Sequence, residues 1–545
     1  MLRVIIRGGL AAVFLVLACG RAVAADGARH VVLVVWDGMR PDFVTEDNTP
    51  MLFQLAREGV TFKNHHPVYP SLTEVNGTAL ATGVYPEISS IIGNKEYRPT
   101  LNLTNSLNTE LEAAVRPGDA LTGGHYIAVS TLGEILHNNG LNTAVAGTKA
   151  VAMFFDRQPR EAGTLGTTVF EGRTSPSSLQ ADLVARLGKF PASGLSKTNR
   201  DNWTTDALIG SLWANGVPAF SLLWLAEPDA SQHQAGPGSP AALAGIRNSD
   251  ANLGRVLKEL ERQGVRENTD IMVVSDHGFS TVNQVTDITS DLQENGFHAV
   301  TKYAEGGPRY NDVMVVGNGG SMFYYVIGNS QSQVEKLVHF LQGRSYCGVV
   351  MTRNSVEGAF TLTDLKINSG MAPDVVMALR TSPDQSTNGT PGQVALDHDQ
   401  YMTGQLGLHQ GMHGSLSPFD MHNTLIAAGP DFAQGISDFL PTGNVDVTPT
   451  VLHLLKVDAK RPMSGRVLAE ALAGDGAETV AVQSRRMETS WQGRTFEWRQ
   501  TLNYSEVNGV VYFDQGVGYQ TPQMAGIEHT GRSRERIQTA GNPAP

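Results

Sequence analysis

The chain has 545 residues, of which 41% are hydrophobic and 17% are charged, and its formal net charge is -12 at pH 7. Such a chain is long for one ordinary domain, but it suits a large α/β enzyme that carries an inserted subdomain around an ample core. The acidic balance and the lack of a basic block argue against nucleic acid as a scaffold-like partner. They leave small phosphate esters open as partners, because bound metal ions can add positive charge to a site.

The N-terminus has the features of an export signal. A basic start, a short apolar run over 10–18 and a small-x-small site before Ala25 predict a signal peptide over residues 1–24. We therefore expect an exported protein, periplasmic or secreted, with no stable membrane insertion after cleavage. An N-terminal membrane anchor and a lipid-modified Cys19 are the alternatives. Cleavage would leave Cys347 as the one thiol, so the hydrophobic core and not a disulfide must stabilise the fold.

Strands and helices alternate along the first half of the chain. A nearly continuous β-branched run over 30–36 predicts a buried strand that ends at Asp37. The remaining predicted elements are helices over 49–59, 73–82, 132–139 and 241–263 and strands over 143–146, 220–225 and 270–274. This order predicts an α/β fold, with a central, largely parallel sheet flanked by helices and a site along the carboxyl edge of its strands.

The second half of the chain is less regular. Its predicted elements are strands over 322–327, 374–379 and 424–428, helices over 334–342 and 447–455, a surface loop over 382–392, and a C-terminal hairpin from 491–498 and 507–513. The polar tail after Ser533 is expected to be disordered. We divide the chain into a signal peptide (1–24), an α/β core (25–278), an inserted subdomain with loops (279–405), the last part of the core (406–474), and a hairpin with a flexible tail (475–545).

Seven metal-binding or nucleophilic side chains fall in five short blocks, and they carry most of the functional information. They are Asp37, Thr73, Asp229 with His233, Asp276 with His277, and His413. Three carboxylates, three imidazoles and one hydroxyl are what two divalent ions sharing one activated hydroxyl require. Carboxylate and imidazole donors suit zinc. The blocks together predict a two-metal hydrolase of phosphate esters.

Thr73 is the candidate nucleophile of this set. It opens the predicted helix over 73–82, where the helix dipole and free N–H groups favour an anion. Taken alone, a threonine at this position is more often a helix N-cap. The surrounding metal-type residues favour the nucleophile.

The same blocks resemble those of the alkaline phosphatase superfamily, and most of all its type I phosphodiesterase/nucleotide pyrophosphatase branch. The resemblance spans roughly residues 31 to 455 and rests on 34–40 (VVWDGMR), 78–86, 91–94, 227–233, 276–278 and 413–414. It implies an alkaline phosphatase-like fold with two zinc ions per chain. One zinc would be bound by Asp229, His233 and His413. The other would be bound by Asp37, Asp276 and His277, with Thr73 bridging to it as the nucleophile. Asn94 matches the asparagine that donates to a phosphoryl oxygen.

Two positions bear on the substrate. Nucleotide-cleaving members usually carry an aromatic ring directly after the nucleophile, where this chain has Glu74. A carboxylate there cannot stack on a base and adds negative charge beside a phosphate pocket. Lys149 is similar to a lysine that related threonine-dependent monoesterases and phosphonoacetate hydrolases place near the second charge of a terminal phosphoryl group. A solvated lysine at a strand end is the alternative interpretation of Lys149.

We therefore expect an exported, zinc-dependent hydrolase of small phosphoric esters that cleaves diesters through a covalent phospho-threonine intermediate. A threonine-dependent alkaline phosphomonoesterase and a phosphonoacetate hydrolase-like enzyme are the alternatives. The formylglycine sulfatase pattern is absent around Thr73, and phosphomutases of this superfamily use serine. A non-catalytic binding protein is disfavoured because the nucleophile and every expected metal ligand are retained.

Overall fold

The computed structural model describes residues 29–157, 165–194, 196–400, 407–474 and 481–522. The predicted signal peptide and the predicted tail after Ser533 lie outside the described residues. None of the described helices combines the length and the hydropathy that a membrane span requires.

A nine-stranded sheet forms the centre of the fold, in the order β22-β2-β21-β10-β1-β9-β6-β7-β8. Its middle is parallel: β1 (His30–Trp36) lies between β10 (Thr269–Val274) and β9 (Phe220–Leu225), and β9 pairs with β6 (Thr143–Gly147). Towards its edges the sheet contains β7 (Gly166–Phe170), β8 (Arg173–Ser175), β21 (Leu425–Ala428), β2 (Val60–Phe62) and β22 (Ile436–Asp438), among which β8 and β21 introduce antiparallel pairs. The predicted largely parallel α/β sheet is thus confirmed.

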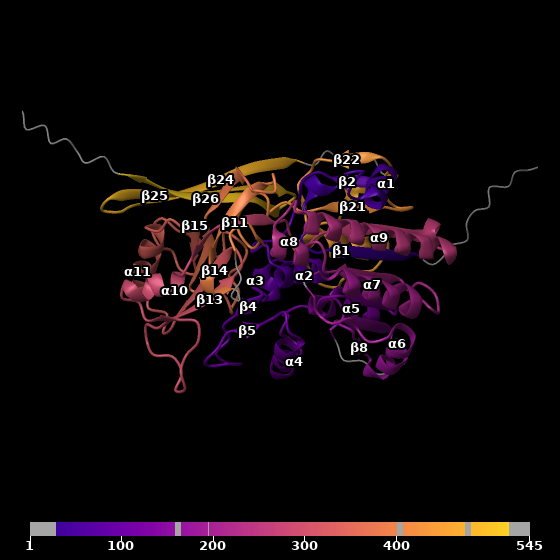
Figure 1. Cartoon of the computed structure of the whole chain (residues 1–545), viewed down its shortest axis with the longest axis horizontal. Coiled ribbons are helices and arrows are strands. Elements are labelled where there is room, and N and C mark those ends of the chain that lie inside the picture. The colour runs from indigo at the N-terminus through magenta and orange to yellow at the C-terminus, as the bar shows by residue number, and fades with distance from the viewer. Residues whose placement is uncertain (1–28, 158–164, 195, 401–406, 475–480, 523–545) are drawn as a thin grey trace, which may run out of the picture.

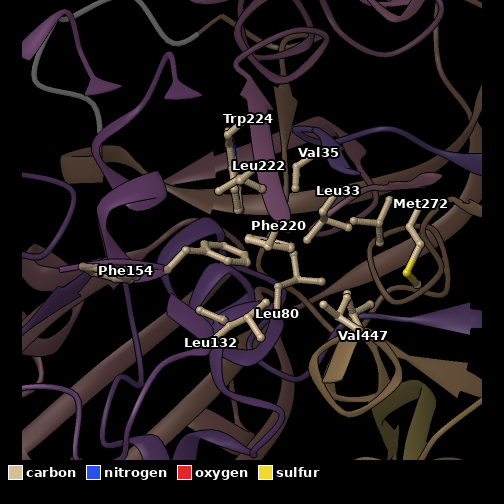
Figure 2. Close-up of a cluster of buried hydrophobic side chains, with 14 of the residues drawn as sticks. Leu33, Val35, Leu80, Leu132, Phe154, Phe220, Leu222, Trp224, Met272 and Val447 are labelled. Carbon is tan, nitrogen blue, oxygen red and sulfur yellow. The ribbon is translucent and has the colours of Figure 1, made fainter. Parts of the chain in front are cut away.

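Strand β1 is buried on both faces, which explains its unbroken run of apolar residues. Val31, Leu33 and Val35 enter one hydrophobic core, whereas the residues between them, such as Val32 and Val34, enter the other. Figure 2 shows the first core, where side chains from β1, β9 and β10 meet those of helices on that face. The two cores therefore lie on opposite faces of the sheet, with β1 between them.

Helices cover both faces of the central sheet (Figure 1). Those around it are α1 (Pro50–Glu58), α2 (Thr73–Thr82), α3 (Pro86–Ser89), α4 (Glu112–Leu121), α5 (Leu132–Asn138), α6 (Gln180–Leu187), α7 (Thr198–Asp206), α8 (Asp229–Ala235), α9 (Pro240–Arg262) and α12 (Val447–Leu454). Five of them, α1, α2, α5, α9 and α12, lie within a few residues of their predicted positions.

Two further sheets follow β10 in the chain. The larger has six strands, β12 (Ala299–Val300), β13 (Val313–Asn318), β14 (Ser321–Val326), β17 (Val375–Leu379), β15 (Cys347–Thr352) and β16 (Phe360–Thr361). Helices α10 (Ile288–Glu294) and α11 (Gln331–Gln342) share a hydrophobic core with this sheet. The smaller has four strands, β18 (Thr381–Gln385), β19 (Pro391–Asp397), β11 (Ser280–Thr286) and β20 (Gly411–Met412).

The predicted surface loop over 382–392 is wrong. Most of it belongs to the hairpin of β18 and β19, and only the residues between these strands form a turn. Strand β18 is an exposed edge strand, which tolerates Ser, Pro and Asp, and Pro391 stands at the first residue of β19. Composition alone therefore suggested a loop where an edge hairpin forms.

The predicted C-terminal hairpin is present but larger than expected. It is a three-stranded antiparallel sheet of β24 (Val482–Gln492), β25 (Phe496–Val507) and β26 (Val510–Pro522). The two predicted strands, 491–498 and 507–513, span its turns instead. Strand β24 is mostly exposed and polar, so it lacks the alternation that marks a strand in the sequence. In Figure 1 this sheet, drawn in yellow, runs along one side of the molecule, and β26 packs on β15 and β3 (His65–His66).

Candidate active site

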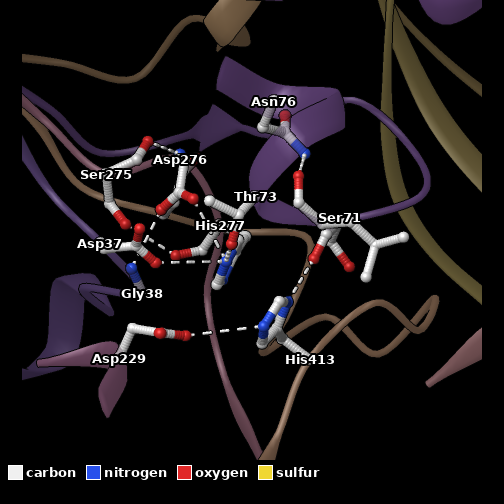
Figure 3. Close-up of polar contacts among 12 residues, drawn as sticks. Asp37, Gly38, Ser71, Thr73, Asn76, Asp229, Ser275, Asp276, His277 and His413 are labelled. Carbon is white, nitrogen blue, oxygen red and sulfur yellow. Dashed lines mark hydrogen bonds and ion pairs between the residues drawn. The ribbon is translucent and has the colours of Figure 1, made fainter. Parts of the chain in front are cut away.

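All seven residues singled out in the sequence lie together at one edge of the central sheet, and Figure 3 labels all of them except His233, which contacts Asp229. Asp37 follows β1, and Asp276 and His277 follow β10. Asp229 begins α8, Thr73 begins α2, and His413 follows β20. Because β1, β9 and β10 run parallel, their carboxyl ends bring these segments to the same place.

The three histidines are held in the same way. The Nδ1 atom of His233 lies 3.0 Å from the Gly411 carbonyl, that of His277 lies 2.9 Å from the Gly278 carbonyl, and that of His413 lies 2.8 Å from the Ser71 carbonyl. A carbonyl only accepts, so each Nδ1 carries a proton, and the lowered pKa values of His277 and His413, caused first by burial, keep the lone pair on their Nε2 atoms. This is the tautomer that a metal ligand requires.

The carboxylates present oxygens to these lone pairs. Asp229 Oδ1 lies 3.1 Å from His233 Nε2 and 3.6 Å from His413 Nε2. Asp276 Oδ2 and Asp37 Oδ1 lie 3.2 and 3.7 Å from His277 Nε2. These three oxygens are buried and accept no hydrogen bond from the described residues. Unpaired carboxylate oxygens facing imidazole lone pairs are unfavourable unless a cation lies between them, so the donors fit divalent metal ions.

The pKa shifts of Asp37, Asp276 and His413 point the same way. Burial raises the pKa of Asp37 to about 8, with a further contribution from Asp276. Burial also raises the pKa of Asp276 to about 7. The pKa of His413 is held well below its usual value by burial and by the neighbouring ring of His277. Ionised carboxylates beside neutral imidazoles therefore need additional positive charge, which a divalent ion supplies.

The tightest donor groups differ in one respect from the ligand sets implied by the resemblance. One group, Asp37, Asp276 and His277, matches the second set. The other joins Asp229 and His413 to His277 rather than to His233. The ring of His277 is stacked on that of His413 with centroids 3.6 Å apart, which brings it into both groups. The His233 side chain is 29% exposed and lies at the rim, still against Asp229.

Thr73 and Asn94 meet at the start of α2. The Thr73 hydroxyl lies 3.2 Å from His277 Nε2, at the first residue of the helix. Asn94 accepts a hydrogen bond from the backbone N–H of Glu74 through Oδ1, at 3.0 Å. The amide Nδ2 of Asn94 donates to Glu110 Oε1 at 3.5 Å, and both residues line the cavity beside Thr73.

Lys149 lies closer to the carboxylates than sequence reasoning expected. Its ammonium donates to Asp229 Oδ2 at 2.6 Å and lies 3.0 Å from Asp37 Oδ2. Burial works against its charge, yet Asp229 and Asp37 raise the pKa of Lys149 well above its ordinary value. The lysine thus binds the outer oxygens, Oδ2, of Asp37 and Asp229. The inner oxygens, Oδ1, of the same carboxylates lack hydrogen-bond partners among the described residues. A solvated lysine, the alternative interpretation, is not what the structure shows.

Two supporting residues were not found from the sequence. Trp224, on β9, donates its indole N–H to Asp37 Oδ2 at 2.8 Å. Asn444 donates to the backbone carbonyl of Asp276 at 2.7 Å. The signal for Trp224 was its position in β9, the buried strand that pairs with the strand preceding Asp37. No local motif marks Asn444, because its partner lies far away in the sequence.

A cavity of about 470 Å³ opens over this cluster. It is lined by Thr73, Asn94, Lys95, Glu110, Lys149, Lys197, Asp229, His233 and His413, among others. Glu74 is buried and is not among the lining residues. Burial and the nearby Glu110 raise the pKa of Glu74 well above its usual value, which disfavours the negative charge that the sequence suggested at this place.

Comparison with known proteins identifies the family pattern. Residues 31–387 match the family model "Type I phosphodiesterase / nucleotide pyrophosphatase", a stretch that ends before His413. Venom phosphodiesterase 2 of Crotalus adamanteus is 25% identical over 258 residues, which cover 47% of this chain and 26% of that protein. Human bis(5'-adenosyl)-triphosphatase ENPP4 is 24% identical over 255 residues, which cover 47% of this chain and 48% of that protein. The chain thus matches half or less of the length of these relatives.

Solved structures show the same fold. The chain resembles murine ectonucleotide pyrophosphatase/phosphodiesterase 5, whose inactive variant was solved in complex with AMP. The TM-score is 0.58 and the sequence identity is 17%, over 82% of this chain and 100% of that chain. The human counterpart gives a TM-score of 0.57 and 16% identity, also over 82% of this chain. At this identity the likeness establishes the fold alone.

Proposed function

Because this chain belongs to the type I phosphodiesterase/nucleotide pyrophosphatase family, we propose that it is an exported, two-zinc hydrolase of phosphoric diesters with Thr73 as its nucleophile. One observation supports this most. The hydroxyl of Thr73 lies at a helix N-terminus, 3.2 Å from His277 Nε2, beside three buried carboxylate oxygens without hydrogen-bond partners among the described residues.

The donors divide between two ions. Asp229, His233 and His413 would hold one zinc, and Asp37, Asp276 and His277 would hold the other, with the Thr73 hydroxyl as a further ligand of the second. Bound zinc would supply the charge that lowers the pKa of the hydroxyl and neutralises phosphoryl oxygens. Lys149 would keep Asp37 and Asp229 oriented, since its ammonium holds their outer oxygens.

The protein groups then perform a two-step displacement. Thr73 Oγ1 bonds to phosphorus as the bond to one ester oxygen in line with it breaks; that group leaves as its alcohol with the proton that Thr73 loses, and the second ester arm stays on the phospho-threonine. Water then attacks the same phosphorus, which releases the phosphomonoester and restores the Thr73 hydroxyl. The Asn94 amide donates to a phosphoryl oxygen throughout, because Glu74 N–H fixes its orientation.

A diester is the better substrate class for this arrangement. Its phosphoryl group carries one negative charge, which the neutral amide of Asn94 suits. The alternative is a threonine-dependent phosphomonoesterase or a phosphonoacetate hydrolase-like enzyme. It is favoured by the ammonium groups of Lys149, Lys95 and Lys197 at the cavity wall, which could meet a second charge. Lys149 forms ion pairs with Asp37 and Asp229, which favours a role in orienting these proposed metal ligands over a role in binding the substrate.

An activity panel on the purified protein tests this proposal. An aryl diester, an aryl monoester, a nucleotide diester and a phosphonate would be assayed with metal content measured in parallel. We expect the aryl diester to be cleaved fastest, with loss of turnover on chelation and recovery with zinc. A zinc-loaded protein that cleaves none of the four would contradict the proposal. Sequencing the N-terminus of the mature protein tests export, with Ala25 expected as the first residue.

A further inference from the structure

A second cluster of metal-type side chains lies outside the candidate active site. It consists of His66, His422 and Asp514, each of which offers one donor atom within 4.8 Å of the others. His66 lies on β3, His422 lies in the segment between β20 and β21, and Asp514 lies on β26 of the C-terminal sheet. The cluster therefore joins three parts of the chain that are far apart in the sequence.

Every imidazole nitrogen in this cluster faces an oxygen. For His66, Nδ1 lies 3.0 Å from the Thr442 carbonyl and Nε2 lies 3.1 Å from Asp514 Oδ1. For His422, Nδ1 lies 2.9 Å from the Pro418 carbonyl, and Nε2 lies 3.2 Å from the Asn64 side-chain oxygen and 4.0 Å from Asp514 Oδ1.

A neutral imidazole cannot satisfy this arrangement alone. It has one N–H, and each ring has an acceptor at both nitrogens. When the carbonyl-facing Nδ1 of a neutral ring carries the proton, the two Nε2 lone pairs point at the oxygens of Asp514 and Asn64. A cation among the donors would resolve the conflict, as in the candidate active site.

The backbone turns Asp514 into this position. In the pairing of β25 with β26, Tyr504 opposes Phe513 and Asn503 opposes Gln515, so Asp514 is the extra residue of a β-bulge. Bulges redirect a side chain at the edge of a regular ladder. The His66 side chain is fully buried, whereas those of His422 and Asp514 are each 28% exposed. The cluster is thus closed on the protein side and open to solvent on the other, which leaves a path for an ion and a water ligand.

We propose that His66, His422 and Asp514 bind a divalent transition metal ion, of which zinc is the best match, separate from the pair in the active site. Two imidazoles and one carboxylate suit zinc, and the Asn64 carboxamide or water would complete the coordination. The ion would link the C-terminal sheet to the core, because Asp514 is contributed by β26 and the histidines by the core. This inference does not depend on the proposed function.

Metal analysis of matched variants tests the proposal. His422→Gln and Asp514→Asn change the two partly exposed ligands, and His453→Gln is the control, since it makes the same change at an exposed histidine of α12. After zinc loading and dialysis of the full chain, we expect each ligand variant to hold about one zinc less per chain than the wild type and the control. Equal zinc content in all four proteins would overturn the proposal.

A second measurement covers the case in which a variant folds poorly. A wild-type crystal grown with zinc would be measured at the zinc absorption edge. We expect an anomalous peak about 2.0–2.2 Å from the Nε2 atoms of His66 and His422 and from an oxygen of Asp514. A map with peaks in the active site and none here would refute the site without affecting the proposed function. A peak here with none in the active site would contradict the two-zinc proposal instead.

Discussion

Thr73 is the residue on which the proposed chemistry depends most, and the structure gives it no role as a helix cap. The N-cap of α2 is Leu72, and the Thr73 hydroxyl faces His277. Thr73→Ala should therefore fold, keep its metal and lose diester turnover by about three orders of magnitude or more. Steady-state kinetics with zinc analysis of the same sample measures both quantities.

Thr73→Ser is the matched control. It keeps a hydroxyl at the same atom, so part of the turnover should remain. If Thr73→Ala instead kept near-normal turnover with full metal content, the threonine would not be the nucleophile, and a water molecule would attack the diester directly.

The ligand residues predict a distinct pattern of metal loss. His413→Ala should deplete one of the two proposed active-site ions and His277→Ala chiefly the other, since the ion-pair partner of His413 is Asp229 and the nearest partner of His277 is Asp276. Each change should remove about one zinc per chain relative to the wild type and abolish turnover. Chelation should do the same to the wild type, reversibly. Full zinc content in both variants would refute the assignment of ligands.

Lys149 separates the two candidate substrate classes. If it orients Asp37 and Asp229, Lys149→Ala should lower kcat for diesters and monoesters alike, by about 10–100-fold, and weaken zinc binding. Rates on both aryl esters and a zinc titration would be compared with the wild type. A wild type that prefers monoesters, together with a selective loss of monoester turnover in the variant, would make Lys149 a substrate ligand and favour the phosphomonoesterase.

Sequence reasoning located the donors at the residue scale but not their surroundings. Local motifs place donor side chains at or just after strand ends. The parallel strands bring these ends to one edge of the sheet, so all seven residues lie together there, as expected. The indole of Trp224, the carboxylates bound by Lys149 and the cluster around Asp514 depend on partners distant in the chain. No local pattern encodes such partners. Burial of Glu74 was missed for the same reason, and it removes the argument that Glu74 adds negative charge beside the phosphate pocket.

At the scale of elements, helix α2 carries Thr73, the proposed nucleophile, and has no space for a larger side chain at Gly77. A Cβ atom there would lie 2.2 Å from Val151 Cγ2 and 3.2 Å from the ring of Trp224. Helix propensity favours Gly77→Ala by about 1 kcal/mol, but overpacking costs about 1–3 kcal/mol. We expect a net loss of stability in denaturant unfolding and lower turnover, because Trp224 also holds Asp37.

Gly210→Ala provides the comparison for that prediction. No atom lies within 4 Å of a Cβ added at Gly210, so only the propensity gain applies. Its stability should be equal to the wild type or higher by up to about 1 kcal/mol. If Gly77→Ala were as stable as Gly210→Ala, the packing around α2 would be looser than the structure indicates.

Elements with a strong hydrophobic period were predictable, and edge elements were not. Helix α9 and strand β9 carry clear periodic or apolar patterns and lie within a residue of their predicted bounds. Strands β18 and β24 are exposed and polar, and they form because a neighbouring strand pairs with them. The boundaries predicted for an inserted subdomain, 279–405, stay a prediction, which limited proteolysis can test.

At the scale of the whole molecule, the C-terminal sheet is part of the packed structure and not an appendage. Trp498, on β25, is completely buried in the core of the six-stranded sheet and donates its indole N–H to the Gly358 carbonyl at 3.1 Å. The two sheets approach so closely that a Cβ on Gly518 would lie 1.7 Å from the Gly348 carbonyl oxygen. The hydrogen bond between Asp514 and His66 and the ring contact between Tyr512 and His66 extend this packing to the core around β3.

This packing predicts that loss of one aromatic side chain destabilises the fold but leaves kcat unchanged. Trp498→Ala removes a large buried ring and should lower the free energy of unfolding by about 3–5 kcal/mol. Trp491→Ala is the matched change on the exposed edge strand β24, where the ring is only partly buried and stacks on His339 at 4.1 Å; it should cost about 1 kcal/mol. Denaturant unfolding measures both, and kcat below the transition should equal that of the wild type, because neither residue lines the cavity. Equal losses in the two variants would mean that the C-terminal sheet is attached only loosely to the six-stranded sheet.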